Sequence, residues 1–302
     1  MPVAELSWLA RNEALVQGWL VLSIVGFSLY TSLRSGAFSV AGVGTWMIGA
    51  YAAGKLSISG SAPVISILVA CFLSAIIGLG LALVLARLRS LYLAMATLSF
   101  VLLVQAIARN WKSVTGGATG LYGIPPVLTT NSLMVVTLLV TVLVYVTERG
   151  RAGRTLAYMR TDEVLARTLG IHTGRARAAA FVLSSTLGGL AGACSAMLFS
   201  LVAPDQGGFT LMVDGLTVVV LGGSGAFFGP LIGAAIVTAF PYLLGFISID
   251  WRLMVQGLII VVMSVYFPGG IVGLVRDFSN FSSRRRETTV EVTDAAPAKV
   301  ES

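Results

Sequence analysis

Residues 49–56, GAYAAGKL, imitate the glycine-rich loop with which nucleotide-binding proteins hold phosphate groups. Gly49, Gly54 and Lys55 have the spacing of that loop. Leu56, however, stands where the loop needs a serine or threonine to hold Mg²⁺, and an apolar helical run precedes the segment where a strand is required. We therefore expect no ATP site and no cofactor in this chain, so that any ATP hydrolysis has to come from another subunit.

Residues for catalysis or metal binding are sparse. The chain has a single histidine, His172, and two cysteines, Cys71 and Cys194, which both lie inside apolar runs. A lone histidine without ligand neighbours makes no metal site, and cysteines in such runs are most often small buried residues. The acids do not cluster either, so the sequence predicts neither a catalytic constellation nor a metal site and disfavours an integral-membrane enzyme.

Asp214 is an acid inside the apolar run FTLMVDGLTVVVL. An acid within a membrane is costly and marks a functional site by default, which makes Asp214 a candidate for a translocation pathway. A second interpretation places Asp214 near the outer membrane interface, a few residues after Gly208, where its carboxylate stays hydrated. The sequence leaves both interpretations open.

The elements that carry these residues are predicted to be membrane helices. Of the 302 residues, 56% are hydrophobic and 11% charged, whereas soluble domains carry about 25% charged residues. No soluble fold of this length hides so much apolar surface. We predict an all-α polytopic integral membrane protein with about eight to ten transmembrane helices, some of them re-entrant. The candidate spans are 14–33, 36–54 (the candidate re-entrant segment), 62–86, 91–108, 131–147, 178–202, 209–224, 227–246 and 252–268.

The placement of arginines orients these spans. Seven arginines lie between residues 149 and 177, and basic loops stay on the cytoplasmic side of a membrane. The loop 148–177 is then cytoplasmic and 109–130 external, with Arg109 and Lys112 as exceptions that snorkel to the interface. Few aromatic residues interleave the arginines, which disfavours nucleic-acid binding. We predict a transmembrane domain over 1–278 and a polar, disordered cytoplasmic tail over 279–302.

The predicted cytoplasmic loop contains TDEVLARTLG, residues 161–170, which has the start and stop features of a helix of about two turns. Thr161 is a good N-cap, and Gly170 suits the position just after the last turn. Asp162 and Glu163 fall in the first turn, where acids interact favourably with the helix dipole. The sequence therefore predicts a short, bounded helix on the cytoplasmic side.

Leu165 and Leu169 are four residues apart and share one face of this predicted helix. Such a helix needs something to pack against. One interpretation is an interfacial helix lying on the bilayer. The other is a docking helix whose apolar face enters a groove of a cytoplasmic partner while its charges fix the orientation.

Two further groups of small residues are predicted to shape the protein. Glycines spaced four apart allow helices to approach closely; they are Gly188 and Gly192, and Gly225, Gly229 and Gly233. The external loop 109–130 is rich in turn-forming residues, so it is either a contact for a solute-binding protein, an outer gate or an ordinary glycine-rich turn. The residues expected to shape it are Thr115, Gly116, Gly117, Gly120 and Gly123.

Several stretches resemble one family of membrane proteins. GRTLAYMRTDEVLARTLGI, 153–171, resembles the coupling helix of ABC-importer permeases, with Glu163, Ala166 and Gly170 in its E-x-x-A-x-x-x-G core. Other stretches resemble the branched-chain amino-acid permease family, in particular its LivM-like branch, in the same order over roughly residues 90–275. These stretches are TGGATGLYGIP (115–125), AFVLSSTLGGLAGA (180–193), VVVLGGSGAFFGPLIGAA (218–235) and FPGGIVGL (267–274).

The resemblance implies a permease subunit of an ABC importer in the bacterial cytoplasmic (inner) membrane, in contact with membrane lipid. It implies branched-chain or related amino acids as cargo, a second related permease subunit, two ATPase subunits that bind ATP, and an extracytoplasmic solute-binding protein. The segment 34–51 lacks the Ser-Leu-Gly-His start of the family, so other amino acids, urea or small amides stay open as cargo. The rival is an ion-gradient-driven secondary transporter, which buries several ionisable residues where this chain offers Asp214.

Overall fold

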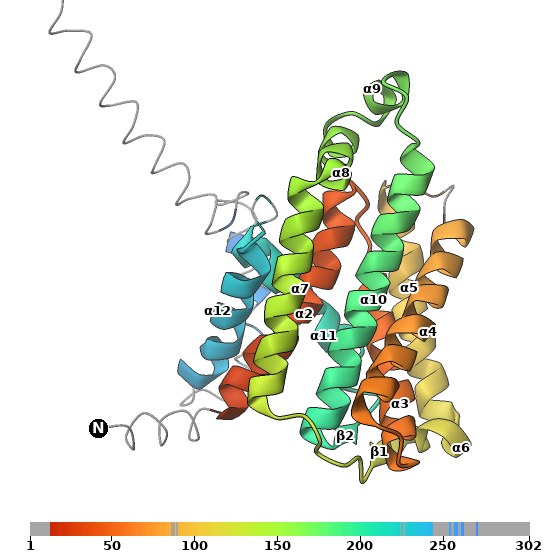
Figure 1. Ribbon diagram of the computed structural model, residues 1–302, viewed down its shortest axis with the longest axis vertical. Helices are drawn as coiled ribbons and strands as arrows, with labels where there is room; N and C mark the ends of the chain where they lie inside the picture. The colour runs from red at the N-terminus through yellow and green to blue at the C-terminus, as the bar shows by residue number, and fades with distance from the viewer. Residues whose placement is uncertain are drawn as a thin grey trace, which may run out of the picture.

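Long apolar stretches fold as helices throughout the described part of the chain. The computed structural model describes residues 13–85, 88, 90–223, 225 and 227–243, and single residues at 254, 257, 258, 261, 262 and 270. Within this part, five helices are long and apolar enough to cross a membrane, so the prediction of an all-α polytopic membrane protein is confirmed (Figure 1). They are α2 (Glu13–Arg34), α4 (Pro63–Val84), α5 (Ser90–Asn110), α7 (Thr130–Arg149) and α10 (Thr173–Phe199).

Shorter elements complete the described fold. The helices are α3 (Ala41–Ile58), α6 (Lys112–Thr115), α8 (Arg151–Thr161), α9 (Glu163–Thr168), α11 (Phe209–Gly222), α12 (Gly229–Leu243) and the 3₁₀ turn η1 (Gly117–Thr119). The strands β1 (Leu121–Tyr122) and β2 (Leu201–Val202) pair antiparallel. The predicted span 252–268 lies almost wholly outside the described residues, and the predicted tail 279–302 lies entirely outside them.

Helix α3 lies in the interior of the bundle and packs against α4, α5 and α10. It covers most of the candidate re-entrant segment, but it is one continuous helix of 18 residues. At about 1.5 Å per residue this length approaches the thickness of the hydrocarbon core, about 30 Å. The phosphate-loop imitation at residues 49–56 forms its second half, so it is helical rather than a loop. Small residues explain why α3 is weakly hydrophobic yet buried.

Glycines bring the backbones of α3 and α10 into contact. A Cβ added to Gly188 would lie 2.9 Å from the carbonyl carbon of Gly42, and one added to Gly192 would lie 2.8 Å from the carbonyl carbon of Trp46. Real Cβ atoms almost never come this close, so each position has room for a hydrogen atom only. The spacing of four places both glycines on the face of α10 that meets α3.

A second close contact joins α11 and α12. A Cβ added to Gly233 would lie 2.9 Å from the carbonyl carbon of Val218, and Gly229 faces the backbone of Gly222 and Gly223. Gly225 differs, because it is exposed in the turn before α12 and an added Cβ there would meet no atom of the described residues within 4 Å. The prediction of a packing role is therefore wrong for Gly225. Its spacing fits the motif, but α12 begins four residues later.

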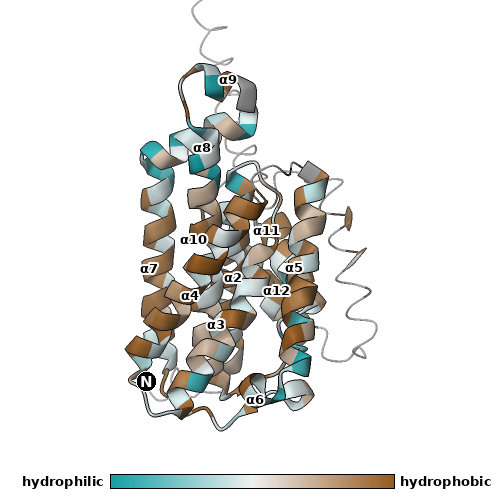
Figure 2. Cartoon of the chain, turned by 90° about the vertical axis from the view of Figure 1, so that its right-hand side faces the viewer, coloured by the Kyte–Doolittle hydropathy of each residue, from teal (hydrophilic) through white to brown (hydrophobic). Residues whose placement is uncertain are grey.

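The helices α4, α5 and α7 form an apolar outer surface, brown in Figure 2. About a fifth of each span, 22%, is buried, against 61% for α2 and 72% for α10. Large side chains such as Phe72, Leu83 and Leu138 are more than 60% exposed. In a membrane this surface faces lipid or another apolar protein surface, which accounts for the high hydrophobic content of the chain.

Side-chain contacts fix the direction of α2. Thr130, the first residue of α7, donates a hydrogen bond to Glu13 Oε1 over 2.6 Å, and Gln17 donates to both. Helices α2 and α7 therefore start at the same end of the bundle. With the arginine-rich end in the cytoplasm, both helices run from the outer side inwards. Arg109, an exception to the charge rule, forms an ion pair with Asp205.

Candidate functional site

The arginine-rich loop forms two helices that project beyond the membrane spans (Figure 1). The sequence predicts a single helix that starts after Thr161, but Thr161 is the last residue of α8, and its hydroxyl donates to the carbonyl of Ala157 over 3.2 Å. Asp162 instead accepts a hydrogen bond from the backbone N–H of Leu165 over 3.2 Å and caps α9. The predicted cap is thus wrong by one residue, because the helical hydroxyl is already engaged and a carboxylate suits the positive helix end.

The end of α9 has the geometry expected from its glycine. Gly170 has φ +78° and donates to the carbonyl of Arg167 over 3.0 Å. Ile171 donates to the carbonyl of Ala166 over 3.1 Å. This pair of bonds is the Schellman motif, which satisfies carbonyls that would otherwise lack partners. Ala166 is 1% exposed, so the inner side of this short helix is packed.

The outer side of α9 presents apolar side chains away from the bundle. Leu165 is 55% exposed and Leu169 is 62% exposed. Figure 2 shows α9 at the far tip of the chain, among hydrophilic segments. Two exposed leucines on a capped helix at a polar tip form a small apolar face.

Helix α8 anchors α9 to the membrane helices. A Cβ added to Gly153 would lie 2.6 Å from the Cα atom of Glu148, so α8 begins against the end of α7. Gly36, at the end of α2 with φ +74°, lies next to the backbone of Arg160. Arg167 Nε donates to the hydroxyl of Thr173, the first residue of α10, over 3.2 Å. The pair α8–α9 is thus connected to α2, α7 and α10.

A charged cluster joins α2 to α7 at the arginine-rich end of the bundle. Glu148 accepts a short hydrogen bond from the hydroxyl of Tyr30 and forms an ion pair with Arg34 Nε over 2.9 Å. The guanidinium of Arg34 lies 5.9 Å from the centre of the Tyr30 ring. The Arg34 and Glu148 side chains are 25% and 17% exposed, so water screens the pair only in part. The sequence alone does not predict this cluster, for which the one clue is a glutamate beside an arginine-rich segment.

The external loop is shaped by backbone conformations that favour glycine. Gly116, Gly117, Gly120 and Gly123 all have φ between 70° and 82°. The Thr115 hydroxyl lies 2.7 Å from the carbonyl oxygen of Ala108 and 2.6 Å from that of Trp111. Pairing of β1 with β2 ties this loop to the segment after α10. The loop is therefore a defined structure at the outer end of the bundle.

Asp214 lies in α11, in the second turn after the helix start at Phe209, and is half-buried. The preceding Gly207 packs against the Trp46 ring, with 2.7 Å between the position of an added Cβ and the ring. Gly208 packs likewise against Gln105 of α5. The start of α11 is thus enclosed by α3 and α5, whereas its length of 14 residues is short of a full membrane crossing.

Comparisons with known proteins place the chain in a family. The family described as "Branched-chain amino acid transport system / permease component" matches residues 14–264. The high-affinity branched-chain amino acid transport system permease protein LivM of Salmonella typhimurium is 27% identical over 224 residues, 63% of this chain and 52% of the relative. LivM of Escherichia coli K12 matches to the same extent.

A second type of permease protein is also similar. LivH of Salmonella typhimurium is 28% identical over 137 residues, 45% of this chain and 43% of the relative. The chain spans about half the length of the LivM relatives it matches, at 52%. No solved structure matches it. The match over residues 14–264 covers most of the chain, which therefore belongs to the branched-chain amino acid permease family, a family of transport components rather than enzymes.

Proposed function

We propose that the chain is the membrane-spanning permease subunit of an ABC importer that moves branched-chain or related amino acids across the bacterial cytoplasmic membrane. The observation that carries this proposal is α9, a capped helix that exposes Leu165 and Leu169 beyond the membrane and is anchored through α8 to three membrane helices. An apolar helix face of this kind fits a groove in a cytoplasmic protein. The family and the names of the LivM and LivH relatives support the cargo class.

The complete importer would contain a second, related permease subunit, two cytoplasmic ATPase subunits that bind ATP, and an extracytoplasmic solute-binding protein. The transmembrane domain would cover residues 1–278, with the tail 279–302 in the cytoplasm. The ATPase subunit would contact α9, which begins at Glu163, is capped by Asp162 and ends at Gly170, and which packs inwards through Ala166; Thr161 closes the preceding α8. The solute-binding protein would contact the external loop shaped by Thr115, Gly116, Gly117, Gly120 and Gly123.

The arrangement suggests how movement passes from the ATPase to the membrane. A displacement of α9 moves α8, which begins directly against the end of α7 at Glu148. Glu148 is bound to Tyr30 and Arg34, so the same displacement pulls on α2. Helix α2 in turn packs on α11 and α12. A small displacement of α9 thereby becomes a rigid movement of packed helices. This movement would open the translocation pathway to one side of the membrane and then to the other.

The docking role is tested with Leu165→Asp/Leu169→Asp in the full importer, reconstituted in vesicles with the ATPase subunits and solute-binding protein. Charges on this apolar face of α9 should abolish co-purification of the ATPase and ATP-driven uptake of leucine. Thr168→Ala changes an exposed residue of the same helix and should retain both. Normal uptake by the double variant contradicts the proposal, as does uptake that follows an ion gradient without ATP.

Asp214 is proposed to face the translocation pathway. Its half-burial in a short helix whose start is enclosed by α3 and α5 suits a group that meets a polar solute inside the membrane. Asp214→Ala should lower uptake while the complex still assembles, which size-exclusion chromatography and vesicle uptake measure together. Unchanged uptake would assign Asp214 to a hydrated interface instead.

A further inference from the structure

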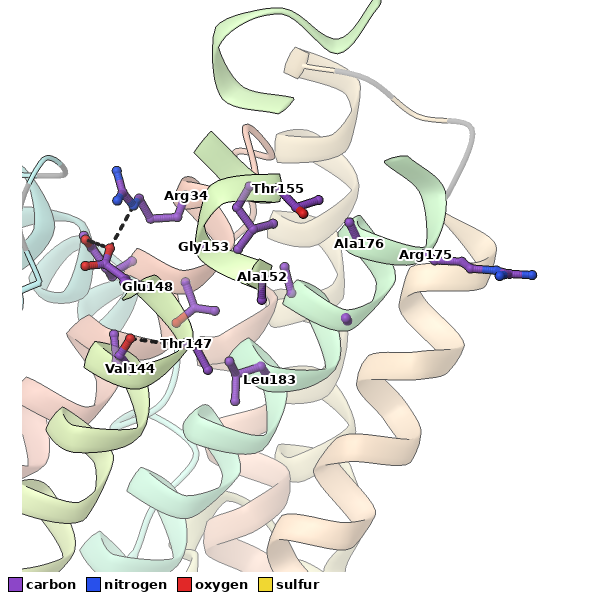
Figure 3. Close-up of a pocket in the computed structure, with 15 residues that line it drawn as sticks. Arg34, Val144, Thr147, Glu148, Ala152, Gly153, Thr155, Arg175, Ala176 and Leu183 are labelled. Carbon is purple, nitrogen blue, oxygen red and sulfur yellow. Dashed lines mark hydrogen bonds and ion pairs between the residues drawn. The ribbon is translucent and has the colours of Figure 1, made fainter. Parts of the chain in front are cut away.

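A lateral cavity lies between α7 and α10 at the cytoplasmic end of the bundle (Figure 3). Helices α7 and α10 both pack on α2, which forms the floor, and α8 covers the cavity from the cytoplasmic side. Its volume is about 480 Å³. Ala152 and Ala179 belong to its lining and are themselves exposed, so the cavity is open towards the surroundings of the bundle.

The interior of the cavity is apolar. Figure 3 shows Val144, Ala176 and Leu183 around its centre, and Arg34 and Glu148 at one edge, bound to each other. The threonine hydroxyls in the lining are satisfied within their own helices: Thr31 donates to Phe27 over 2.8 Å, Thr147 to Val144 over 2.7 Å and Thr155 to Arg151 over 3.0 Å. The Tyr30 hydroxyl is bound to Glu148. A zwitterionic amino acid would find poor polar partners here, whereas a hydrocarbon chain fits the lining.

The rim of the cavity is basic. Arg175 lines it and points away from its centre, towards the outside of the bundle (Figure 3). Arg151 and Arg154 are exposed on α8, next in sequence to Ala152, Gly153 and Thr155 of the lining. Arg149, at the end of α7, is exposed and lies 4.5 Å from the Tyr145 ring. The acid beside these residues, Glu148, is already paired with Arg34. Around the cavity the described residues thus expose more basic than acidic side chains, and the positive-inside orientation predicts that they lie near the cytoplasmic lipid headgroups.

We propose that this cavity binds one acyl chain of an anionic phospholipid from the cytoplasmic leaflet, with the phosphate held by Arg151, Arg154 and Arg175. The basic rim complements an anionic headgroup, and the apolar interior complements its chain. The bound chain would lie beneath α8, between α7 and α10, so it supports the anchor of α9 from below. This inference does not depend on the cargo or on the ATPase.

The binding is tested on the full chain, purified in a neutral detergent and examined by native mass spectrometry. The wild-type chain should retain one phosphatidylglycerol through washing that removes other lipids. Ala179→Phe fills the mouth of the cavity and should abolish this retention. Val135→Phe adds a similar ring to the exposed surface of α7 away from the cavity, and should leave retention unchanged. Equal retention by both variants overturns the proposal; thermal unfolding confirms that each variant is folded.

The role of the rim is tested with Arg151→Gln/Arg154→Gln/Arg175→Gln in vesicles of phosphatidylglycerol or phosphatidylcholine. The wild-type chain should bind phosphatidylglycerol more tightly than phosphatidylcholine. The triple variant should lower this ratio of affinities roughly tenfold, because each surface arginine contributes to anionic lipid binding. Lys112→Gln removes a charge at the outer end and should change nothing. A photoreactive phosphatidylglycerol should crosslink to α7 and α10. Crosslinks confined to α4 and α5, or a protein subunit crosslinked in the cavity of the assembled importer, overturn the proposal.

Discussion

The two sides of α10 have similar small residues and opposite packing. On the side that meets α3, Gly188 and Gly192 allow backbone contact, and nothing larger than a hydrogen atom fits. On the side that faces α7, Ala176, Ala179 and Ala180 line a cavity of about 480 Å³. Small residues therefore do not close an interface by themselves. Glycines close it where the neighbouring backbone can approach, whereas α7 is held away from α10 because both helices pack on α2.

This difference has a mechanical consequence. The α3–α10 interface is continuous, so the two helices move as one unit. The gap beside α7 lies directly beneath α8, where the candidate coupling helices are anchored. We expect displacement of α8–α9 to be taken up at the gap and at the Glu148 cluster, while the α3–α10 unit keeps its packing. Three predictions test this division.

The largest effect is expected from Gly192→Leu, which places a side chain into the backbone of α3. The overlap must separate α3 from α10 and should lower the free energy of unfolding by about 2 kcal/mol or more. Gly174→Ala, at the start of the same helix where an added Cβ meets nothing within 4 Å, is the matched control. Thermal unfolding in detergent measures both. A small effect of Gly192→Leu would mean that the α3–α10 contact is adaptable and that the contrast between the two sides of α10 is not real.

A smaller effect is expected from Glu148→Gln at the movable end. Loss of the carboxylate charge weakens the bond from Tyr30 and removes the ion pair to Arg34, which should cost about 1–2 kcal/mol of stability. In the assembled importer the variant should hydrolyse ATP with less uptake per ATP, because the end of α7, against which α8 begins, is held less firmly to α2. Tyr30→Phe removes one hydrogen bond and keeps the ion pair, so its stability and its uptake per ATP should lie between those of the wild type and those of Glu148→Gln. Unchanged coupling in both variants would remove this cluster from the mechanism.

Much of the fold was predictable because a bilayer requires long apolar helices, and glycine spacing reports on backbone contact. The ends of α2, α4 and α7 fall within a few residues of the predicted spans. The Glu148 cluster was not predictable, since Tyr30 and Glu148 are 118 positions apart and meet only after α2 and α7 have packed. Gly225 shows an error of the opposite kind, a contact that was expected and is not found. It has the right spacing from Gly229 and Gly233, but it lies in the turn before α12, outside the helix.

The candidate site shows the same limit at smaller scale. Local chemistry predicted Gly170 correctly as the end of α9, because a positive φ is a property of one residue and its neighbours. The start of α9 was misplaced by one residue, because the choice between Thr161 and Asp162 depends on where α8 ends. The extent of α8 is in turn decided by its contacts with α2, α7 and α10, which lie far away in the sequence.

The smallest effect is expected from a change at Asp162, which caps α9. It shows whether α9 opens separately from α8. Asp162→Ala removes the acceptor for the N–H of Leu165 and should cost α9 about 1 kcal/mol, so that amides of residues 165–169 exchange with solvent about fivefold faster. Thr161→Ala should leave their exchange nearly unchanged, because that hydroxyl bonds within α8. Hydrogen–deuterium exchange of the purified chain compares the two. If the variants changed exchange equally, α8 and α9 would open together as one unit, and the hydrogen bond from Leu165 to Asp162 would not set the stability of α9 separately from that of α8.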